Sequence, residues 1–464
     1  MTTSPQPRSS GRDNGAAGGD SRATYQKGLM RSIGRLAGKS FAVALIAGAV
    51  LAWPLAAATP TAKPEEVGFS SERLHRINDL VQRHITAGSF SGAVTLVARN
   101  GRIAHFETQG LMDIESRKPM QKDAIFKIMS MTKPVVGVSI MMMIEEGKVR
   151  LTDPVSKFIP ELKDLKVAVP MAAGAANAPA GGRGGASEAR YYTVPAEREI
   201  TIRDLMTHTS GLVSGGLSGT EARKVALKGK ESLADYIPRL GGVPLDFQPG
   251  TRWAYSAQAG FDTLARIVEI VSGMPFDQFT KTRIFDPLGM KDTFFYPADG
   301  NPRMVTRYAR GQSGQLEKQG LANFFNGAYF SGGGGLMSTA EDYMQFAQML
   351  LNGGRANGKV FLSPRTVEMM GSVHAPDTLP GRPRGEGYGL SMRVVNDPVA
   401  RNTFLSQGSF GWSGAFGTHF WIDPKEKIVA VLMTQTSNNE IRGDFENAVM
   451  YALVGGGAAA SGTN

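Results

Sequence analysis

The feature that most constrains the fold is an apolar run at 134–144, which only Gly137 and Ser139 interrupt. As a helix this run is hydrophobic nearly all round, so we expect it to be buried in the centre of a domain. Pro134 suits an early helical position, because its missing N–H costs little there. The preceding residues, Ser-Met-Thr-Lys, place Ser130 near the positive end of the helix dipole and Lys133 one turn further on.

The pair Ser130 and Lys133 predicts a nucleophile beside a base. Side chains three residues apart share a helix face. Burial disfavours the charged form of an amine, which would let Lys133 accept a proton near neutral pH. The alternative is a plain helix cap, because this spacing arises about once by chance in a chain of this length. No other serine in the sequence has Lys three residues later.

Composition narrows the possible classes of protein. The 464 residues, 42% of them hydrophobic, can bury a large core as one large domain or two closely packed ones. The lack of cysteine excludes disulfides, thiol nucleophiles and cysteine metal sites. Of the formal charge of +10, residues 1–58 contribute half, with seven Lys or Arg against two Asp. The remaining basicity is mild and has no run interleaved with aromatic residues, so we expect no nucleic-acid partner.

Residues 1–58 are expected to form a leader. The apolar stretch 41–53 follows basic residues and precedes Pro-Leu-Ala-Ala-Ala, a cleavage pattern typical of a secretory signal peptide. We therefore expect a periplasmic or secreted protein without a membrane span after cleavage. The alternative is an inner-membrane anchor by an uncleaved segment 41–58, which is about the shortest length that spans a bilayer. Met30 would open a signal of ordinary length, so we expect translation to start there; a precursor mass that includes residues 1–29 would refute this.

Strand signals lie near both ends of the chain, at 94–98, 102–106, 388–395, 419–423 and 428–434. Asn100-Gly101 separates the first two and supplies the positive φ angles of a tight hairpin turn. The middle of the chain is mostly helical. These patterns predict an α+β fold, with an antiparallel sheet built from the N- and C-terminal ends and flanked by helices. We assign this sheet region to 59–160 with 330–464, and a mostly helical inserted region to 161–329.

Apolar spacing and end signals place the helices. They are 70–86 with a Ser70 or Ser71 cap, 202–208, 262–272 closed by Gly273, and 343–351 behind a capping box of Ser338 and Glu341. The Ala/Gly-rich stretch 171–190 predicts a mobile surface loop. The glycines at 332–335 lack the ending of a phosphate loop, and we expect them to permit close backbone packing near a site.

Two further segments carry candidate site residues. Tyr255 follows a Pro249-Gly250 turn and precedes the helix at 262–272, so it could take the proton of Ser130 and later give it to a leaving group. The alternative is a core tyrosine with a satisfied hydroxyl. The stretch 408–415, Gly-Ser-Phe-Gly-Trp-Ser-Gly-Ala, leads into the last strand pair, and its glycines would let a sheet edge approach a substrate.

Together these motifs resemble the serine β-lactamase-like hydrolases. The order of motifs in that superfamily is matched by Ser130-x-x-Lys133, His208-Thr209-Ser210-Gly211, Tyr255-Ser256, the glycine run before Leu336, and Gly411-Trp412-Ser413-Gly414-Ala415. The similarity covers roughly residues 65–455 and looks closest to the family VIII carboxylesterases, which share the fold of class C β-lactamases and DD-peptidases.

The resemblance implies a role for each matching residue. Ser130 would be acylated, Lys133 and Tyr255 would serve as base and proton shuttle, and the backbone N–H groups of Ser130 and Ala415 would form the oxyanion hole. Loss of one oxyanion donor costs about 3 to 4 kcal/mol. No cofactor is implied, and we expect no metal, because the chain has no His-Glu-x-x-His motif. His208 is expected to be structural.

The expected substrate-binding residues, Ala257, Trp412, Ser413 and Gly414, include two departures from the β-lactamase pattern. Ala257 stands where β-lactamases have Asn, and Trp412-Ser413-Gly414 replaces Lys-Thr-Gly. An indole in place of a cation suits a neutral, apolar group. We therefore expect a carboxylesterase that forms an acyl-enzyme on small or medium apolar esters.

Three alternatives remain open at this stage. The chain could be a β-lactamase or DD-peptidase, or a catalytically silent protein that binds cell-wall peptides. It could also be a Ser-His-Asp hydrolase, because Gly411-Trp412-Ser413-Gly414-Ala415 nearly matches the nucleophile elbow Gly-x-Ser-x-Gly.

Overall fold

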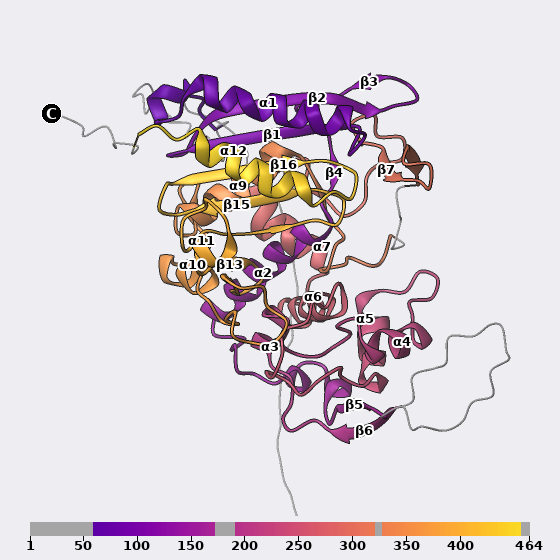
Figure 1. Ribbon diagram of the computed structural model, residues 1–464. Helices are drawn as coiled ribbons and strands as arrows, with labels where there is room; N and C mark the ends of the chain where they lie inside the picture. Colours follow the sequence, from indigo (N-terminus) through magenta and orange to yellow (C-terminus); the bar gives the residue numbers. More distant parts are fainter. Residues whose placement is uncertain (1–58, 172–190, 321–326, 456–464) are drawn as a thin grey trace, which may run out of the picture. The chain divides into compact units, whose positions relative to one another are not determined.

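An eight-stranded antiparallel sheet organises the computed structural model, which describes residues 59–171, 191–320 and 327–455 (Figure 1). In sheet order the strands are β12 Glu386–Tyr388, β13 Arg393–Val395, β14 Phe410–Ser413, β15 His419–Asp423, β16 Ile428–Met433, β1 Gly92–Arg99, β2 Arg102–Asp113 and β3 Lys118–Pro119. β1 pairs with β16, from Val94 opposite Met433 to Arg99 opposite Ile428. The predicted α+β fold, with a sheet built from both ends of the chain, is confirmed.

Helices cover both faces of the sheet. Val97, Trp421 and Leu432 face one side and share a core with buried residues of α1 and α12. Their neighbours in the same strands, such as Phe420 and Val431, belong to a larger core that includes α2 and α9. Alternating side chains of each strand therefore serve two cores. The α-helices are α1 Ser71–Thr86, α2 Thr132–Glu145, α3 Ile202–Met206, α4 Leu217–Lys224, α5 Leu233–Tyr236, α6 Ala259–Ser272, α7 Phe276–Thr280, α8 Asp286–Leu288, α9 Ala340–Leu351, α10 Pro364–Met370, α11 Pro398–Arg401 and α12 Glu440–Tyr451.

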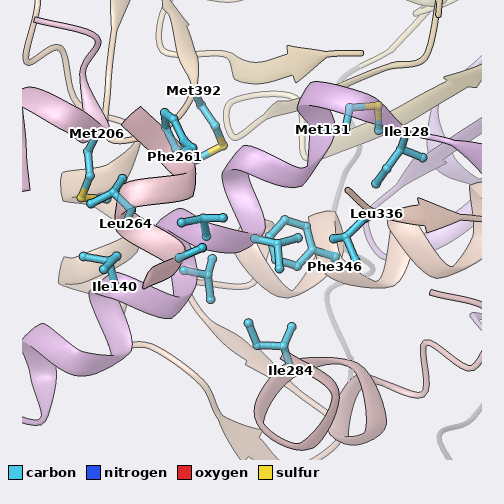
Figure 2. Close-up of a cluster of buried hydrophobic side chains, with 14 of the residues drawn as sticks. Ile128, Met131, Ile140, Met206, Phe261, Leu264, Ile284, Leu336, Phe346 and Met392 are labelled. Atoms are coloured by element: carbon cyan, nitrogen blue, oxygen red, sulfur yellow. The ribbon is translucent and has the colours of Figure 1, made fainter. Parts of the chain in front are cut away.

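The predicted buried helix is α2, and its residues from Thr132 to Met143 are all buried. Figure 2 shows Ile140 of this helix in one cluster with Met206, Leu264 and Phe346, which come from α3, α6 and α9. The all-round apolar surface of α2 is thus matched by neighbours from several parts of the chain. Short 3-10 turns complete the helical elements: η1 Pro64–Val67, η2 Met129–Met131, η3 Val155–Lys157, η4 Pro160–Leu162 and η5 Ile237–Gly242, with one π turn at Lys281–Phe285.

Several local predictions are confirmed. The Ser70 side chain accepts a hydrogen bond from the backbone N–H of Arg73 at the start of α1. Asn100 and Gly101 have φ angles of 53° and 73°, as the hairpin between β1 and β2 requires. Gly273 ends α6 with a φ of 71°.

Two other local predictions, for a strand and for a helix cap, are wrong. Residues 388–395 form a hairpin of β12 and β13, not one strand, with Tyr388 opposite Arg393. The apolar pattern runs through the turn because Leu390 and Met392 are themselves buried. The cap of α9 is Thr339, whose side chain accepts from the Asp342 N–H, and not Ser338.

Among the described residues, four small antiparallel pairs lie outside the main sheet. They are β4 Phe126–Lys127 with β9 Met337–Ser338, β5 Lys166–Pro170 with β6 Tyr191–Pro195, β7 Arg307–Arg310 with β8 Leu316–Gln319, and β10 Arg355–Ala356 with β11 Lys359–Val360. Most of the stretch 171–190, which was expected to be a mobile loop, lies outside the described residues, as does the expected signal segment 41–58. In the part of the chain that the structure describes, no helix combines the length and the apolar character needed to cross a membrane.

Leu264→Ala should lower the free energy of unfolding by about 2–5 kcal/mol, because it leaves a cavity between α6 and its neighbours. Ile270 lies on the same helix but is 40% exposed, whereas Leu264 is fully buried. Ile270→Ala is therefore the matched control and should cost no more than about 1 kcal/mol. Urea unfolding followed by circular dichroism measures both, and equal losses would contradict the packing of α6.

Candidate active site

Ser130 lies in the short turn η2, and α2 begins two residues later than the sequence suggested, at Thr132. The Ser130 hydroxyl caps no helix among the described residues, which argues against the plain-cap alternative. Met129 precedes it with a φ of 48°, a strained backbone conformation for a residue with a side chain. The Tyr343 hydroxyl donates to the carbonyl of Met131 at 2.7 Å and holds the turn from α9.

Lys133 is fully buried beneath this turn. Its Nζ lies 3.2 Å from the Ser130 Oγ, 2.6 Å from the carbonyl oxygen of Ala257 and 2.7 Å from that of Gly333. Two of the three hydrogen-bonding directions of the amine are thus taken by backbone carbonyls. The third faces Ser130, which is the geometry that a base for this hydroxyl needs.

Tyr255 approaches Ser130 from another direction. Its hydroxyl lies 2.7 Å from the Ser130 Oγ, and the Lys133 Nζ is 4.9 Å from the centroid of its ring. The hydrogen-bond partner of this tyrosine is therefore the serine itself. The arrangement places one hydroxyl between a phenol and an amine, so a proton can move from Ser130 to either group.

His208 holds the segment that carries Tyr255. Its carbonyl oxygen accepts from the N–H of Ala254, and its Nδ1 accepts from the N–H of Ser256, at 3.1 Å and 3.3 Å. Its ring packs edge-on against Tyr255, with centroids 4.6 Å apart. Burial, together with the charge of Lys133, lowers the pKa of His208 well below its usual range, so the ring is neutral and Nδ1 can accept.

Asp262 supports Lys133 through the glycine run. Its carboxylate is buried and accepts from the Ser331 hydroxyl, the Tyr329 hydroxyl and the Gly333 N–H, at 2.7, 2.8 and 2.8 Å. Burial raises the pKa of Asp262, while these hydrogen bonds and the Lys133 charge act in the opposite direction. Gly333, whose carbonyl oxygen accepts from Lys133, is thus also held at its N–H by the carboxyl group of Asp262.

The glycine run permits this close approach, as expected from the sequence. A Cβ at Gly333 would lie 2.7 Å from the Cα of Gln258. Any larger residue would push the run away from the start of α6, and with it the carbonyl that receives Lys133.

Strand β14 brings Trp412 to the site, with its ring centroid 5.6 Å from that of Tyr255. The sequence suggested that this segment lies at the edge of the sheet. In the structure β14 lies between β13 and β15. However, β13 pairs only with Phe410 and Gly411, whereas Trp412 and Ser413 pair with β15 alone. The strand is therefore locally unpaired on one side where it meets the site.

The turn after β14 lies against the segment that leads to Ser130. A Cβ at Gly414 would lie 2.2 Å from the carbonyl oxygen of Ile128, so only glycine fits there. Ala415 follows in an exposed turn. Within the described residues, the backbone N–H groups of Ser130 and Ala415 have no hydrogen-bond acceptor, a condition that oxyanion-hole donors must meet.

Ser413 points to the other face of the sheet, where it contacts His419. The Ser413 Oγ lies 2.8 Å from the His419 Nδ1, and the His419 Nε2 lies 2.9 Å from the Oε1 of Glu446. Burial lowers the pKa of His419. Burial alone would raise the pKa of Glu446, but the charge of Arg393 and the bond from His419 bring it to about 2. A polar cavity of about 350 Å³ lies beside this row and is also lined by Arg442.

The expected residues thus separate into two groups. Ser130, Lys133 and Tyr255 are in direct contact, Ala257 contributes its carbonyl, and Trp412 packs beside Tyr255. Ser413 lies away from this cluster. Sequence reasoning missed three features: the Ser413–His419–Glu446 row, and the contacts of Asp262 and of Arg442. The only local signal was the acidic residue Asp262 in the first turn of α6.

Comparison with known proteins identifies the family of this chain. The Beta-lactamase family matches residues 77–452. Protein Rv1367c of Mycobacterium tuberculosis is 36% identical over 368 residues, which cover 75% of this chain and 86% of that protein. Esterase EstB of Burkholderia gladioli is 28% identical over 418 residues, covering 85% and 97%.

Among solved structures, EstCE1, described as a hydrolase with promiscuous acyltransferase activity, superposes with a TM-score of 0.67. The two sequences are 25% identical, and the match covers 83% of this chain and 99% of that one. From the extent of these matches, the chain belongs to the Beta-lactamase family and is a serine hydrolase of the serine β-lactamase-like superfamily.

Proposed function

We propose that this serine hydrolase is a carboxylesterase that acts on small or medium apolar esters. The observation that carries the proposal is Trp412, a neutral indole packed against Tyr255 at the position where the β-lactamase pattern has a lysine. An indole offers apolar surface to an acyl or alcohol group but no charge to a carboxylate. The similarity to Esterase EstB supports an ester as the substrate.

The surroundings of Trp412 are aromatic. Its ring centroid lies 5.1 Å from that of Tyr388, and Trp253 lies 5.9 Å from the same tyrosine. The nearby cation, Arg382, is stacked over Trp253 and paired with Glu386 at 2.8 Å, so its charge is already matched. These contacts favour a neutral substrate over an anionic one.

In the proposed reaction the Ser130 Oγ attacks the ester carbonyl while Lys133 and Tyr255 take its proton. The negative charge on the carbonyl oxygen is received by the N–H groups of Ser130 and Ala415. Collapse of the tetrahedral intermediate breaks the bond to the alcohol, which Tyr255 protonates. A water molecule, deprotonated by the same pair, then attacks the acyl-enzyme and releases the acid and free Ser130.

Ser130→Ala and Lys133→Ala should each lower kcat for p-nitrophenyl butyrate by roughly a thousandfold or more. Tyr255→Phe, which removes one hydroxyl and keeps the ring, should lower it by about 10²–10⁴. Circular dichroism should show native fold for all three. A folded Ser130→Ala enzyme with full activity would contradict the assignment.

Acyl trapping separates the ester from the β-lactam alternative. Intact-protein mass spectrometry after brief exposure to p-nitrophenyl butyrate should show a butyryl adduct that peptide mapping places on Ser130, with rapid ester turnover. A cephalosporin should give neither a stable adduct nor fast hydrolysis. Reaction with the cephalosporin alone would favour a penicillin-recognising enzyme, and reaction with neither would favour a silent binder.

One observation favours a second candidate, a Ser-His-Glu hydrolase with Ser413 as its nucleophile. The hydrogen bonds from Ser413 to His419 and from His419 to Glu446 have the order of a catalytic triad. However, Glu446 already pairs with Arg393, so less of its charge remains to stabilise an imidazolium. We therefore expect this row to hold β14 in place.

Ser413→Ala tests the second candidate directly. It should keep most of the ester turnover and leave the butyryl adduct on Ser130, because the row lies on the opposite face of β14. A folded Ser413→Ala enzyme that is as inactive as Ser130→Ala, with no adduct, would transfer the nucleophile role to Ser413.

A further inference from the structure

The peptide unit between Gly414 and Ala415 is held from the side opposite the proposed oxyanion site. Its carbonyl oxygen, which belongs to Gly414, accepts a hydrogen bond from the Nη2 of Arg442 at 2.5 Å. In a planar trans peptide the C=O and N–H groups point in opposite directions. The same carbonyl also accepts from the N–H of Gly417 at 3.2 Å, so the guanidinium and this turn together determine where the N–H of Ala415 points. The N–H of Ala415 itself is left without an acceptor among the described residues.

Neighbouring bonds hold the same turn. The N–H of Gly414 donates to the carbonyl of Thr418 at 2.8 Å, and the Ser437 hydroxyl donates to the carbonyl of Ala415 at 2.7 Å. The Thr418 hydroxyl donates to the carbonyl of Ile128 at 3.2 Å, which ties the turn to the segment before Ser130. These bonds hold the carbonyl oxygens of Gly414 and Ala415 and leave the N–H of Ala415 free to meet a ligand.

Arg442 brings charge as well as a hydrogen bond. Burial, with the nearby charge of Arg393, lowers the pKa of Arg442 only to about 10, so it is a cation at neutral pH. In the described part of the chain it forms no ion pair, and its Nε has no hydrogen-bond partner. A cation at the carbonyl end of a peptide polarises the unit and makes its N–H a stronger donor.

We propose that Arg442 is a positioning residue for the oxyanion hole, which orients and polarises the Gly414–Ala415 peptide so that the N–H of Ala415 stabilises the developing oxyanion. This inference rests on the proposed function. It assigns to α12 a part in the chemistry, although no residue of that helix contacts Ser130, Lys133 or Tyr255 through a hydrogen bond in the described structure.

Arg442→Met tests the proposal with two substrates, p-nitrophenyl butyrate and its thiono analogue, in which sulfur replaces the carbonyl oxygen. Sulfur accepts hydrogen bonds weakly, so the oxyanion hole stabilises the transition state of the thiono ester only slightly. We expect kcat for the oxygen ester to fall roughly 10- to 100-fold, with KM little changed. The rate ratio of oxygen ester to thiono ester should fall by the same factor.

Arg442→Lys keeps the charge but not the planar fork, so its kcat should lie between those of the Met variant and the native enzyme. It also carries the test if Arg442→Met does not fold. Arg401→Met is the matched control, because Arg401 lines the same polar cavity but donates to Glu386. We expect Arg401→Met to leave the rate ratio unchanged.

The remaining outcomes of the Arg442→Met experiment would contradict either this inference or the proposed function. Equal losses with both esters would show a structural role, and a raised KM would show direct contact of Arg442 with substrate. Either result overturns the inference. If the native enzyme turns over the oxygen ester but the ratio of oxygen-ester rate to thiono-ester rate is unchanged in Arg442→Met, the role of Arg442 is contradicted and the proposed function is not. Native enzyme that does not turn over the ester would contradict the proposed function.

Discussion

The site depends on one buried amine. Lys133 is shielded from solvent, and an amine in such a place must find hydrogen-bond acceptors within the protein. It finds three: the Ser130 hydroxyl one turn away, the carbonyl of Ala257 before α6, and the carbonyl of Gly333 in the glycine run. Satisfying this single group brings together three segments that lie up to 200 residues apart in sequence. One of the contacts that satisfy the amine also places it beside Ser130, the proposed nucleophile.

The elements recoverable from sequence are those whose signals are local. The spacing of Ser130 and Lys133, the Asn100-Gly101 hairpin and Gly273 at the end of α6 each depend on residues within a few positions of one another. The spacing of apolar residues and the preferences of turn residues are enough to predict these features. The fold class is predicted from the same local signals, because strands at both ends of a chain with helices between them favour one sheet shared by the two ends.

The features that could not be predicted depend on contacts between residues that are far apart in the sequence. The buried turn between β12 and β13 has strand-like apolar residues, because it fills the core instead of facing water. The sequence around Asp262 predicts only a helix residue, since its three hydrogen-bond donors lie 67 to 71 residues later in the chain. Arg442 donates a hydrogen bond to the carbonyl oxygen of Gly414, 28 residues away, and the sequence of neither segment predicts this contact. Such residues are found by tracing hydrogen bonds outward from the reacting group.

The two-residue period of β14 explains why the side chains of Trp412 and Ser413 have different neighbours. Successive side chains of a strand face opposite sides of the sheet, so Trp412 joins Tyr255 on one side and Ser413 joins His419 on the other. In the proposed mechanism, a triad-like row on the second face therefore does not compete for a substrate that reacts at Ser130 on the first. The row is linked to the proposed oxyanion site through the backbone, because the strand that ends at Ser413 continues into the Gly414–Ala415 peptide. Contacts on one face of the sheet can thus set the geometry of a hydrogen-bond donor that is proposed to act on the other.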